Sequence, residues 1–288
     1  MAKRSSKILV LGSGFPAEDI AEELSAERLE IDLLERGASR SLAGRLARAC
    51  PATIVHTARS LSPRLPRRPG AYDPVVAKAL AAALSRWLDA GGRLRSLIAL
   101  SSTAVYGTAI GSPLAFTESG PLGEVDPASD FGRWVSELRE SEAVLGDIGK
   151  SRGFAVTLLR AAPLVGGCEG GALGDYLSHT VPLRVLGYDP PFQLLHSSDL
   201  VTAVVAAADV RHNGPLNITG RGTVPLSRLG ALAGKPALPV PARLAAFLAP
   251  RSMALERLMR RCVADNARAH QVLGFTPRYS AEEALAEL

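Results

Sequence analysis

Short, uniformly apolar runs alternate along this chain with longer amphipathic stretches, and no other sequence feature constrains the fold as strongly. Runs without polar alternation predict strands that are buried on both faces. Such strands are expected at residues 7–11, 53–57, 94–100 and 154–159, with another near 29–34. Helices are expected at about 16–25, 42–49, 73–91 and 129–150. The alternation of strands with helices of this length predicts an α/β fold with a doubly wound parallel sheet, covered on both faces.

The pattern changes beyond about residue 165, where helices become shorter and prolines more frequent. Short strands are expected at 192–195 and 216–218. We therefore expect a core formed by residues 1–165 and a smaller C-terminal α/β lobe formed by residues 166–288, which shares some elements with the core. Open α/β sheets bind ligands at the carboxyl ends of their strands, so the cleft between the two parts is the expected ligand site.

Charge and cysteine content argue against several classes of function. The net charge of the 288 residues is +5, but the arginines are scattered among acidic residues, whereas a nucleic-acid-binding face needs clustered positive charge. Cys50, Cys168 and Cys262 lie far apart without metal-ligand spacing, which predicts no metal site and a reducing compartment. The apolar run near the N-terminus is too short for a signal peptide, and no run reaches membrane-spanning length. We expect a cytoplasmic protein that binds neither nucleic acid nor membrane.

A pair of glycines, Gly12 and Gly14, follows the first expected strand and precedes the first helix. Glycines at such a place let the backbone turn sharply and bring amide groups against a pyrophosphate at the helix N-terminus. The third glycine of such a loop is replaced by Ala17, and Pro16 removes one amide from the first turn. The segment thus predicts cofactor contacts at Gly12, Gly14 and Phe15, with a tight turn that binds no ligand as the alternative.

An acidic residue about 20 positions farther on commonly holds the adenosine ribose of a dinucleotide. Asp32 or Glu35 could take this role, and Arg36 could meet a 2′-phosphate. An ordinary charged strand end is the equal alternative. Asp32 is the residue that we predict to contact a cofactor.

The run that starts at Ser101 is the most specific motif in the chain. Ser101 and Ser102 stand at the carboxyl end of an apolar strand, where a hydroxyl can hydrogen-bond a substrate oxygen at the mouth of the cleft. Together with Val105, Tyr106 and Gly107 they form a Ser-Ser-x-x-Val-Tyr-Gly motif. This motif resembles the signature of extended short-chain dehydrogenases, the NAD-dependent epimerase/dehydratase group.

Further matches to this family follow in the expected order along nearly the whole chain. They are Ile54-Val-His-Thr-Ala58, Leu159-Arg-Ala-Ala-Pro-Leu-Val-Gly166, Phe192-Gln-Leu-Leu-His-Ser-Ser-Asp-Leu200 and Leu273-Gly-Phe-Thr-Pro-Arg-Tyr279. The resemblance implies a Rossmann-like fold and a cleft for NAD or NADP, with cofactor contacts at Thr57, Ala58, Ser101 and Pro163. It also implies a small-molecule or nucleotide ligand, and a homodimer formed through the helices near 74–90 and 129–150.

Two departures from the family concern its catalytic residues. The family's active helix begins Pro-x-Ser-x-Tyr-Gly-x-Ser-Lys, whereas the stretch from Pro127 has Phe131 at the tyrosine position and Val135 at the lysine position. In the family this tyrosine is the general acid/base, and the lysine lowers its pKa and holds the nicotinamide ribose. General acid–base groups contribute about 10²–10⁴-fold in rate. We therefore expect ordinary redox turnover to be nearly absent, and the altered glycine loop counts against NAD(P) binding.

No tyrosine of the chain is followed four residues later by a lysine, so the pair does not recur at one-turn spacing elsewhere. Ser102 remains at the position of the family's substrate-polarising hydroxyl and is the one catalytic candidate, although a serine there often caps a turn. His56 and His196 are expected to be structural histidines with satisfied hydrogen bonds, and Asp199 a first-turn acid of the following helix. Another tyrosine beside Ser102, with an activating cation close by, would contradict an inactive site.

The segment between Gly12 and Ala58 contains one expected strand where the family has two. Either residues 29–34 form the second strand, or residues 31–33 correspond to the family's third strand and the adenosine-binding strand is deleted. We favour the deletion because the glycine loop is altered as well.

These observations favour a divergent member of the family, a pseudoenzyme that binds a small molecule or nucleotide without redox catalysis. One alternative is an NAD(P)-dependent oxidoreductase or epimerase with an unusual acid/base, acting on a sugar-nucleotide-like or isoprenoid-like substrate. Another is a cofactor-free isomerase or lyase that uses Ser102, His196 or Asp130.

Overall fold

A six-stranded parallel sheet forms the centre of the molecule, in the order β2-β1-β3-β4-β5-β10. The computed structural model describes residues 7–12, 16–30, 38–57, 73–107, 115–166, 183–232, 238–248 and 262–287. The strands of the sheet are β1 (Ile8–Leu11), β2 (Glu27–Leu29), β3 (Thr53–His56), β4 (Ser96–Ser102), β5 (Ala155–Ala161) and β10 (Gly214–Ile218). Every residue of β3, β4 and β5 is buried, as expected from their uniformly apolar runs.

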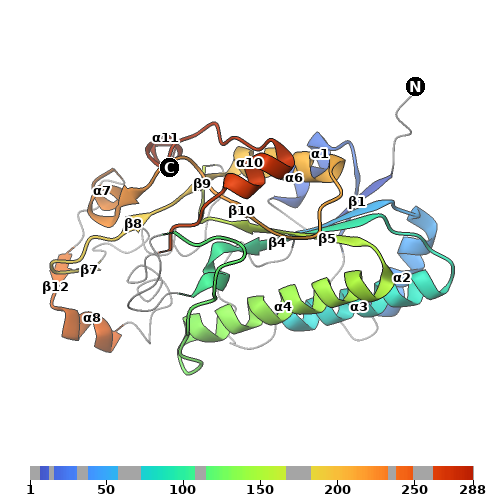
Figure 1. Ribbon diagram of the computed structural model, residues 1–288, viewed down its shortest axis with the longest axis horizontal. Coiled ribbons are helices and arrows are strands. Elements are labelled where there is room, and N and C mark those ends of the chain that lie inside the picture. The colour runs from blue at the N-terminus through green and yellow to red at the C-terminus, as the bar shows by residue number, and fades with distance from the viewer. Residues whose placement is uncertain are drawn as a thin grey trace.

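Helices cover both faces of this sheet (Figure 1). One layer consists of α2 (Ala38–Ala49), α3 (Asp73–Asp89) and α4 (Asp130–Arg152). The other consists of α1 (Ala17–Glu23), α6 (Ser197–Asp209) and α10 (Ala267–Leu273). The predicted α/β fold with a doubly wound, Rossmann-like parallel sheet is therefore confirmed.

Alternate residues of each strand divide the core between the two helical layers. In β1, Leu9 and Leu11 pack in the cluster that contains the buried side chains of α2 and α3. Val10 between them packs in the cluster that contains the buried side chains of α1 and α6. This period of two is the ordinary side-chain geometry of a strand, and it gives the sheet an apolar core on both faces.

Local sequence signals define the long helix α4 at both ends. The Oγ of Ser129 accepts a hydrogen bond from the backbone N–H of Gly132 at 2.9 Å, which caps the N-terminus. Gly153 ends the helix in the left-handed conformation with φ 76°. The helix expected at 129–150 is therefore confirmed, and its first turn is fixed by a cap that belongs to the family-like motif.

The C-terminal part of the chain supplies elements to the core and also builds small sheets of its own. The two-stranded sheets pair β6 with β9, β8 with β11, and β7 with β12. Their strands are β6 (Leu164–Val165), β7 (Leu183–Val185), β8 (Pro191–Phe192), β9 (Leu195–His196), β11 (Val224–Pro225) and β12 (Leu238–Val240). The remaining helices discussed below are η2 (Thr103–Tyr106), α7 (Leu226–Leu232), α8 (Ala242–Leu248) and α11 (Ala281–Ala286). The single strand expected at 192–195 is wrong, because it is divided between β8 and β9.

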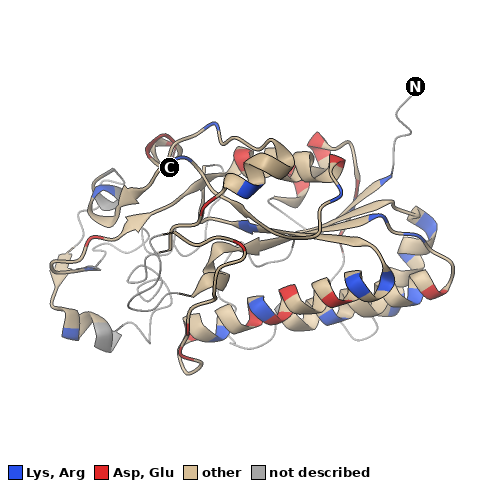
Figure 2. Ribbon diagram, viewed as in Figure 1, with Lys and Arg blue, Asp and Glu red and all other residues tan. Residues whose placement is uncertain are grey.

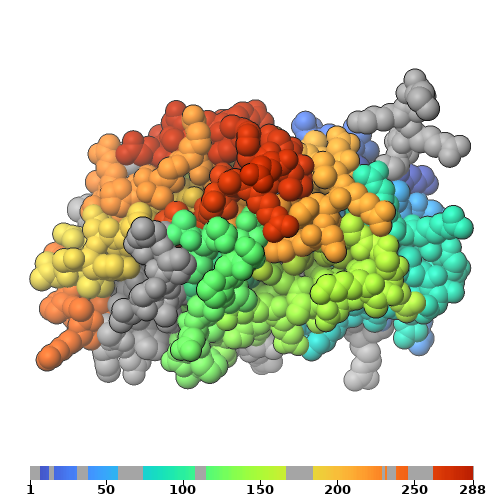
Figure 3. All heavy atoms as spheres, viewed as in Figure 1, coloured from blue at the N-terminus to red at the C-terminus, as the bar shows by residue number. Residues whose placement is uncertain are grey.

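The two parts of the chain are interleaved. Although β10 and α6 follow residue 165, they complete the central sheet and one of its helical layers. Phe116 forms a parallel bridge with Ala264. In the space-filling view, the red atoms of the C-terminal part lie directly on green atoms from the middle of the chain (Figure 3). The division of the chain into two parts at residue 165 stays a prediction. Residues after this position contribute β10 and α6 to the core.

The strand before residue 53 lies directly beside β1. In the parallel register Leu9, Val10 and Leu11 pair with Glu27, Arg28 and Leu29. In the strand order of dinucleotide-binding sheets, the neighbour of the first strand on this side is the second, adenosine-binding strand. This position of β2 counts against deletion of the adenosine-binding strand, the alternative that we favour from the sequence, although residues 31–33, on which that alternative rests, lie outside the described residues. Among the described residues, it is the outermost third strand that has no counterpart.

Charged residues are dispersed along the helices rather than gathered in one segment (Figure 2). On α3 and α4 they form pairs that join the helices, Lys78 with Glu140 and Arg152 with Asp89. In the described part of the chain, no helix has the length and hydropathy needed to span a membrane.

Candidate functional site

The turn after β1 lies against the end of β3, at the carboxyl edge of the sheet. The Oγ1 of Thr57 donates to the backbone oxygen of Leu11 at 3.2 Å. A Cβ added to Gly12 would lie 1.9 Å from that same Oγ1, so only glycine fits there. Gly12 and Thr57, two of the predicted cofactor contacts, are therefore brought together. Four other predicted contacts, Gly14, Phe15, Asp32 and Ala58, lie outside the described residues.

An acidic residue that we did not predict stands at the level of the glycine turn. Because Leu11 pairs with Leu29, the next residue of each strand, Gly12 and Glu30, lie at the same level, and Gly12 N–H donates to Leu29 O at 3.2 Å. The side chain of Glu30 is 67% exposed, and Arg28 lies 3.9 Å from its carboxylate. Sequence spacing pointed to Asp32 instead, because β2 was expected to begin two residues later than it does.

Ser101 and Ser102 point to opposite faces of the sheet. The Oγ of Ser101 donates to Glu142 of α4 at 2.6 Å, so a contact of Ser101 with a cofactor would have to use its backbone. The Oγ of Ser102 accepts from the backbone N–H of Ala104 at 3.2 Å and caps η2. Ser102 thus has the structural role that we weighed against catalysis, although its hydroxyl proton is still available to a second partner.

Phe131 and Val135, at the positions of the family's tyrosine and lysine, lie in an apolar cluster. They are 3% and 0% exposed and pack with Val105, Tyr106 and Phe116. The first turn of α4, capped by Ser129, directs them there. An apolar cluster offers no proton donor at these positions, which agrees with the loss of the acid/base pair inferred from the sequence.

Tyr106 is the tyrosine nearest in sequence to Ser102, and it does have a cationic neighbour. Its Oη donates to Asn217 Oδ1 at 2.7 Å and accepts from Arg160 Nη1 at 3.1 Å. The side chain is fully buried, and this burial raises the pKa of the phenol, although Arg160 opposes the effect. Tyr106 is therefore less acidic than a free tyrosine, and both of its hydrogen bonds go to interior residues. It does not replace the missing activated phenol.

A buried ion pair holds this network together. Arg160 of β5 and Glu142 of α4 are joined by two close contacts, Nη2–Oε2 at 2.6 Å and Nε–Oε1 at 3.0 Å. Burial disfavours the charge of Arg160, but its bonds with Glu142 keep its pKa above the usual value. Sequence reasoning missed this pair, since the partners lie on different elements and no local pattern marks them.

His56 is buried, and one of its ring nitrogens lacks the hydrogen bond that we expected for a structural histidine. Its Nδ1 and the Oγ of Ser141 have no hydrogen-bond partner within the described residues. Both residues line a small cavity beneath α4, together with Ser101 and Glu142. Burial lowers the pKa of His56 from its ordinary 6.5 to about 4, so the ring is neutral at pH 7.

Acid is expected to destabilise the protein through His56. Since its pKa is lower in the folded state, the unfolded chain binds the proton first as the pH falls from about 6.5 to about 4, and the stability present above pH 6.5 is lost in that window. The loss amounts to about 3 kcal/mol at pH 4. Urea unfolding at pH 7, 5.5 and 4.5 should show a shallower pH dependence for His56→Gln. Equal slopes in the two proteins would contradict the assignment.

The segment after β5 joins the core to the C-terminal part. Leu195 N–H donates to the backbone oxygen of Pro163 at 2.9 Å, and β6 pairs with β9. A Cβ added to Gly166, where φ is 77°, would lie 2.2 Å from Nε2 of His196. Pro163 therefore lies at the carboxyl edge of the sheet, at the point where the two parts of the chain meet, and its predicted contact with a cofactor stays a prediction.

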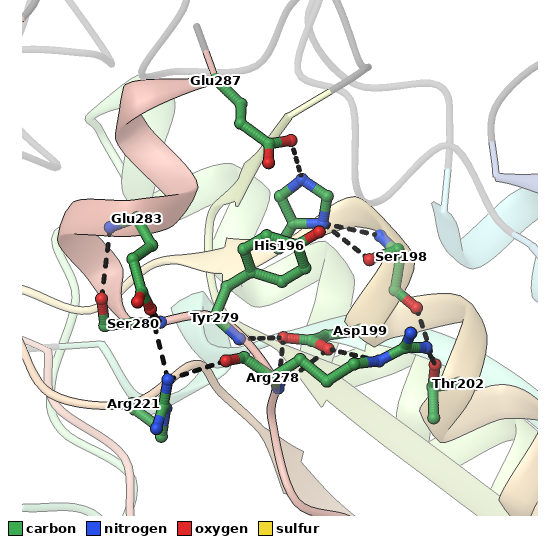
Figure 4. Close-up of polar contacts among 10 residues, drawn as sticks. All are labelled: His196, Ser198, Asp199, Thr202, Arg221, Arg278, Tyr279, Ser280, Glu283 and Glu287. Atoms are coloured by element: carbon green, nitrogen blue, oxygen red, sulfur yellow. Dashed lines mark hydrogen bonds and ion pairs between the residues drawn. The ribbon is translucent and has the colours of Figure 1, made fainter.

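Asp199 does more than we predicted for a first-turn acid of α6. It is fully buried, and its carboxylate accepts hydrogen bonds from the backbone N–H groups of Arg278 and Tyr279, at 3.1 and 3.2 Å (Figure 4). Asp199 thus anchors the chain segment that leads into α11.

Within the described residues, no group of three His, Cys, Asp or Glu side chains could hold a metal ion.

Comparison with curated sequences gives only uncharacterized relatives. No protein-family model matches the sequence. Uncharacterized proteins of Mycobacterium tuberculosis and Mycobacterium bovis are each 29% identical to the chain over 153 residues. The match covers 51% of this chain and 39% of each relative, so it extends over about two fifths of the length of the curated relatives.

Nucleotide-sugar epimerases and a dehydratase are among the solved structures with the same fold. UDP-glucose 4-epimerase from Thermotoga maritima, solved with UDP-glucose, has a TM-score of 0.73 at 18% identity, over 98% of this chain and 96% of that chain. dTDP-glucose 4,6-dehydratase from Bacillus anthracis, solved with NAD, has a TM-score of 0.70 at 14% identity, over 98% and 94%. A tyrosine-to-phenylalanine mutant of UDP-glucuronic acid 4-epimerase from Bacillus cereus, with UDP-4-deoxy-4-fluoro-glucuronic acid and NAD, has a TM-score of 0.70 at 17% identity, over 98% and 97%. The chain therefore has the fold of these epimerases and dehydratases.

Proposed function

We propose that this protein binds a nucleotide or nucleotide sugar at the carboxyl edge of its sheet and carries out no hydride transfer through a tyrosine–lysine pair. The observation that carries the proposal is the burial of Phe131 and Val135 in an apolar cluster, at 3% and 0% exposure. A phenylalanine has no proton to transfer, and a buried valine can neither activate a phenol nor hold a ribose.

Retention of part of the binding edge supports the first half of the proposal. Gly12 packs on Thr57, and β2 occupies the place of the adenosine-binding strand. The exposed carboxylate of Glu30 stands beside Gly12, where an acidic residue would meet a ribose. Enzymes with this fold are solved with UDP-glucose and with NAD. NAD or NADP is therefore a candidate ligand together with the nucleotide sugars.

A phenylalanine in place of a tyrosine need not abolish ligand binding in this fold. The Bacillus cereus epimerase with a tyrosine-to-phenylalanine change was solved with both a nucleotide sugar and NAD. By analogy, the aromatic ring of Phe131 is compatible with an occupied cleft. The protein would then serve in binding, regulation or assembly. We also propose that it forms a homodimer through α3 and α4.

Ligand binding is expected to raise the melting temperature of the purified protein. A ligand that binds only the folded state at 100 times its Kd adds about 2.7 kcal/mol to stability. Thermal unfolding should be followed with NAD⁺, NADH, NADP⁺, UDP, UDP-glucose and dTDP-glucose, and at least one should stabilise the protein. Mixing the nicotinamide cofactors with the sugars should leave the nicotinamide absorbance unchanged.

A matched pair of variants tests the position of the site. Glu30→Ala should weaken binding of a dinucleotide by about tenfold, the usual effect of one charge-assisted hydrogen bond. Glu18→Ala should leave it unchanged, although Glu18 also pairs with Arg28, at 3.2 Å. No stabilisation by any of the ligands would refute nucleotide binding, and hydride transfer by the wild-type protein would refute the silenced site.

A further inference from the structure

A second group of side chains lies at the carboxyl edge of the sheet, at the N-terminus of α6. Because α6 leads into β10, which is parallel to β5, its C-terminus meets the amino edge of the sheet and its N-terminus meets the carboxyl edge. His196 and Ser198 stand at that N-terminus. They thus lie at the same edge as Ser102 and the glycine turn, but on a different strand connection.

Ser198, His196 and Glu287 are joined in one chain of hydrogen bonds (Figure 4). The Oγ of Ser198 lies 2.7 Å from His196 Nδ1, and His196 Nε2 lies 2.9 Å from Oε2 of Glu287. The backbone N–H of Ser198 also donates to Nδ1 at 3.2 Å. A nitrogen that accepts from an N–H carries no proton of its own, so Nδ1 is the acceptor and Nε2 donates to the carboxylate.

The surroundings fix the imidazole, and the serine beside it is partly exposed. The ring of Tyr279 stacks on that of His196 with 3.9 Å between centroids and 22° between planes. Gly166 approaches the other atoms of the ring so closely that a Cβ would lie 2.2 Å from Nε2. The side chain of His196 is only 8% exposed, whereas Ser198 is partly exposed. A base held in one orientation within hydrogen-bond distance of a partly exposed serine is the arrangement that nucleophilic serine catalysis needs.

We propose that Ser198, His196 and Glu287 form an acyl-transfer site for carboxylic esters. As Oγ of Ser198 attacks the ester carbon, its proton passes to Nδ1 of His196 and a bond forms between Oγ and carbon. The carbon–oxygen bond to the alcohol then breaks, and the leaving alcohol takes the proton from Nδ1. Water repeats the sequence on the acyl-serine and releases the carboxylic acid. Glu287 acts as a positioning residue, which holds the tautomer and stabilises the imidazolium.

This site does not depend on the proposed nucleotide binding, since none of its three residues belongs to the glycine turn or to the cluster around Phe131. The chain also offers a matched control serine. Ser227 lies at the N-terminus of α7. Its Oγ donates to Asp189 Oδ2 at 2.5 Å, and this contact involves no imidazole. A hydroxyl that is paired with a carboxylate has no imidazole to accept its proton during attack, so Ser227 should be unreactive.

Labelling with a fluorophosphonate probe tests the proposal on the full chain. Peptide mapping should place the label on Ser198 and not on Ser227, and Ser198→Ala should abolish it while Ser227→Ala leaves it unchanged. His196→Gln should slow labelling by about 10²-fold or more, the usual contribution of a general base. Label that is absent from Ser198, or that persists at full rate in His196→Gln, overturns the proposal.

Hydrolysis of p-nitrophenyl acetate separates positioning from structure at Glu287. Because Glu287 is 51% exposed, Glu287→Gln should fold as the wild type does, with an unchanged melting temperature. Its kcat should fall by about tenfold with KM unchanged, less than the roughly 10⁴-fold effect of a buried orienting aspartate. Glu287→Asp should recover part of the rate. Equal kcat in the wild type, Ser198→Ala and Glu287→Gln overturns the proposal.

Discussion

Replacing Arg160 with methionine is expected to lower the free energy of unfolding by about 3–5 kcal/mol. The change removes all three contacts with Glu142 and the hydrogen bond to Tyr106. Glu142, whose side chain is 10% exposed, would be left as a buried charge with Ser101 as its main remaining partner. Urea unfolding at pH 7 of the wild type and the variant measures the difference.

Two comparisons show whether the buried charge causes that loss. The double change Arg160→Met with Glu142→Leu should recover much of the stability, because no unpaired charge remains. Arg152→Met removes an exposed partner of Asp89, 2.6 Å away in the wild type, and should cost at most about 1 kcal/mol. Similar losses of unfolding free energy in the Arg152 and Arg160 variants would show that the buried network stabilises the fold no more than an exposed ion pair does.

Introducing the family's lysine, Val135→Lys, is expected to destabilise the fold by roughly 4–7 kcal/mol at pH 7. Val135 is fully buried in an apolar cluster. Burial of an ammonium lowers its pKa by up to about 3–5 units, each worth about 1.36 kcal/mol. The loss should be read from urea unfolding, and it should shrink as the pH rises because the neutral amine is then favoured.

Two variants on the same helix serve as controls for Val135→Lys. Ala143→Lys places the same side chain on the exposed face of α4 and should change stability by no more than about 0.5 kcal/mol. Phe131→Tyr adds only a hydroxyl and should cost about 1–3 kcal/mol if that hydroxyl finds no partner. A stable Val135→Lys protein would mean that the position opens to a polar cleft, and the silenced site would then need to be reconsidered.

The fold could be predicted well because its signals are local. The central strands β3, β4 and β5 are mainly apolar runs, and Leu97 and Ile98, which point to opposite faces of the sheet, are both fully buried. The ends of α4 could be placed because a serine cap and a glycine in the left-handed conformation are short-range signals. The start of β2 could not be predicted, because its sequence, Glu-Arg-Leu, has two residues of opposite charge and only one apolar residue.

The candidate sites were harder to predict from the sequence, because the residues that form them are far apart along the chain. His196 and Glu287 meet only after β9 and the C-terminal end of the chain come together, and no spacing rule links them. The pairing of Arg160 with Glu142 depends in the same way on how α4 lies on β5. By contrast, the substitutions at Phe131 and Val135 are legible in the sequence, and the structure adds that both side chains are buried.

The interleaving of the two parts of the chain has a consequence for how the molecule is made. Strand β5 is buried over its whole length and bonds on one side to β4 and on the other to β10, which is synthesised much later. A nascent chain that has emerged only as far as residue 166 would present the apolar edge of β5 unpaired, and such edges invite association with other chains. The ribosome must therefore deliver β10 before this edge is protected, and a fragment cut at the lobe boundary should aggregate rather than fold alone.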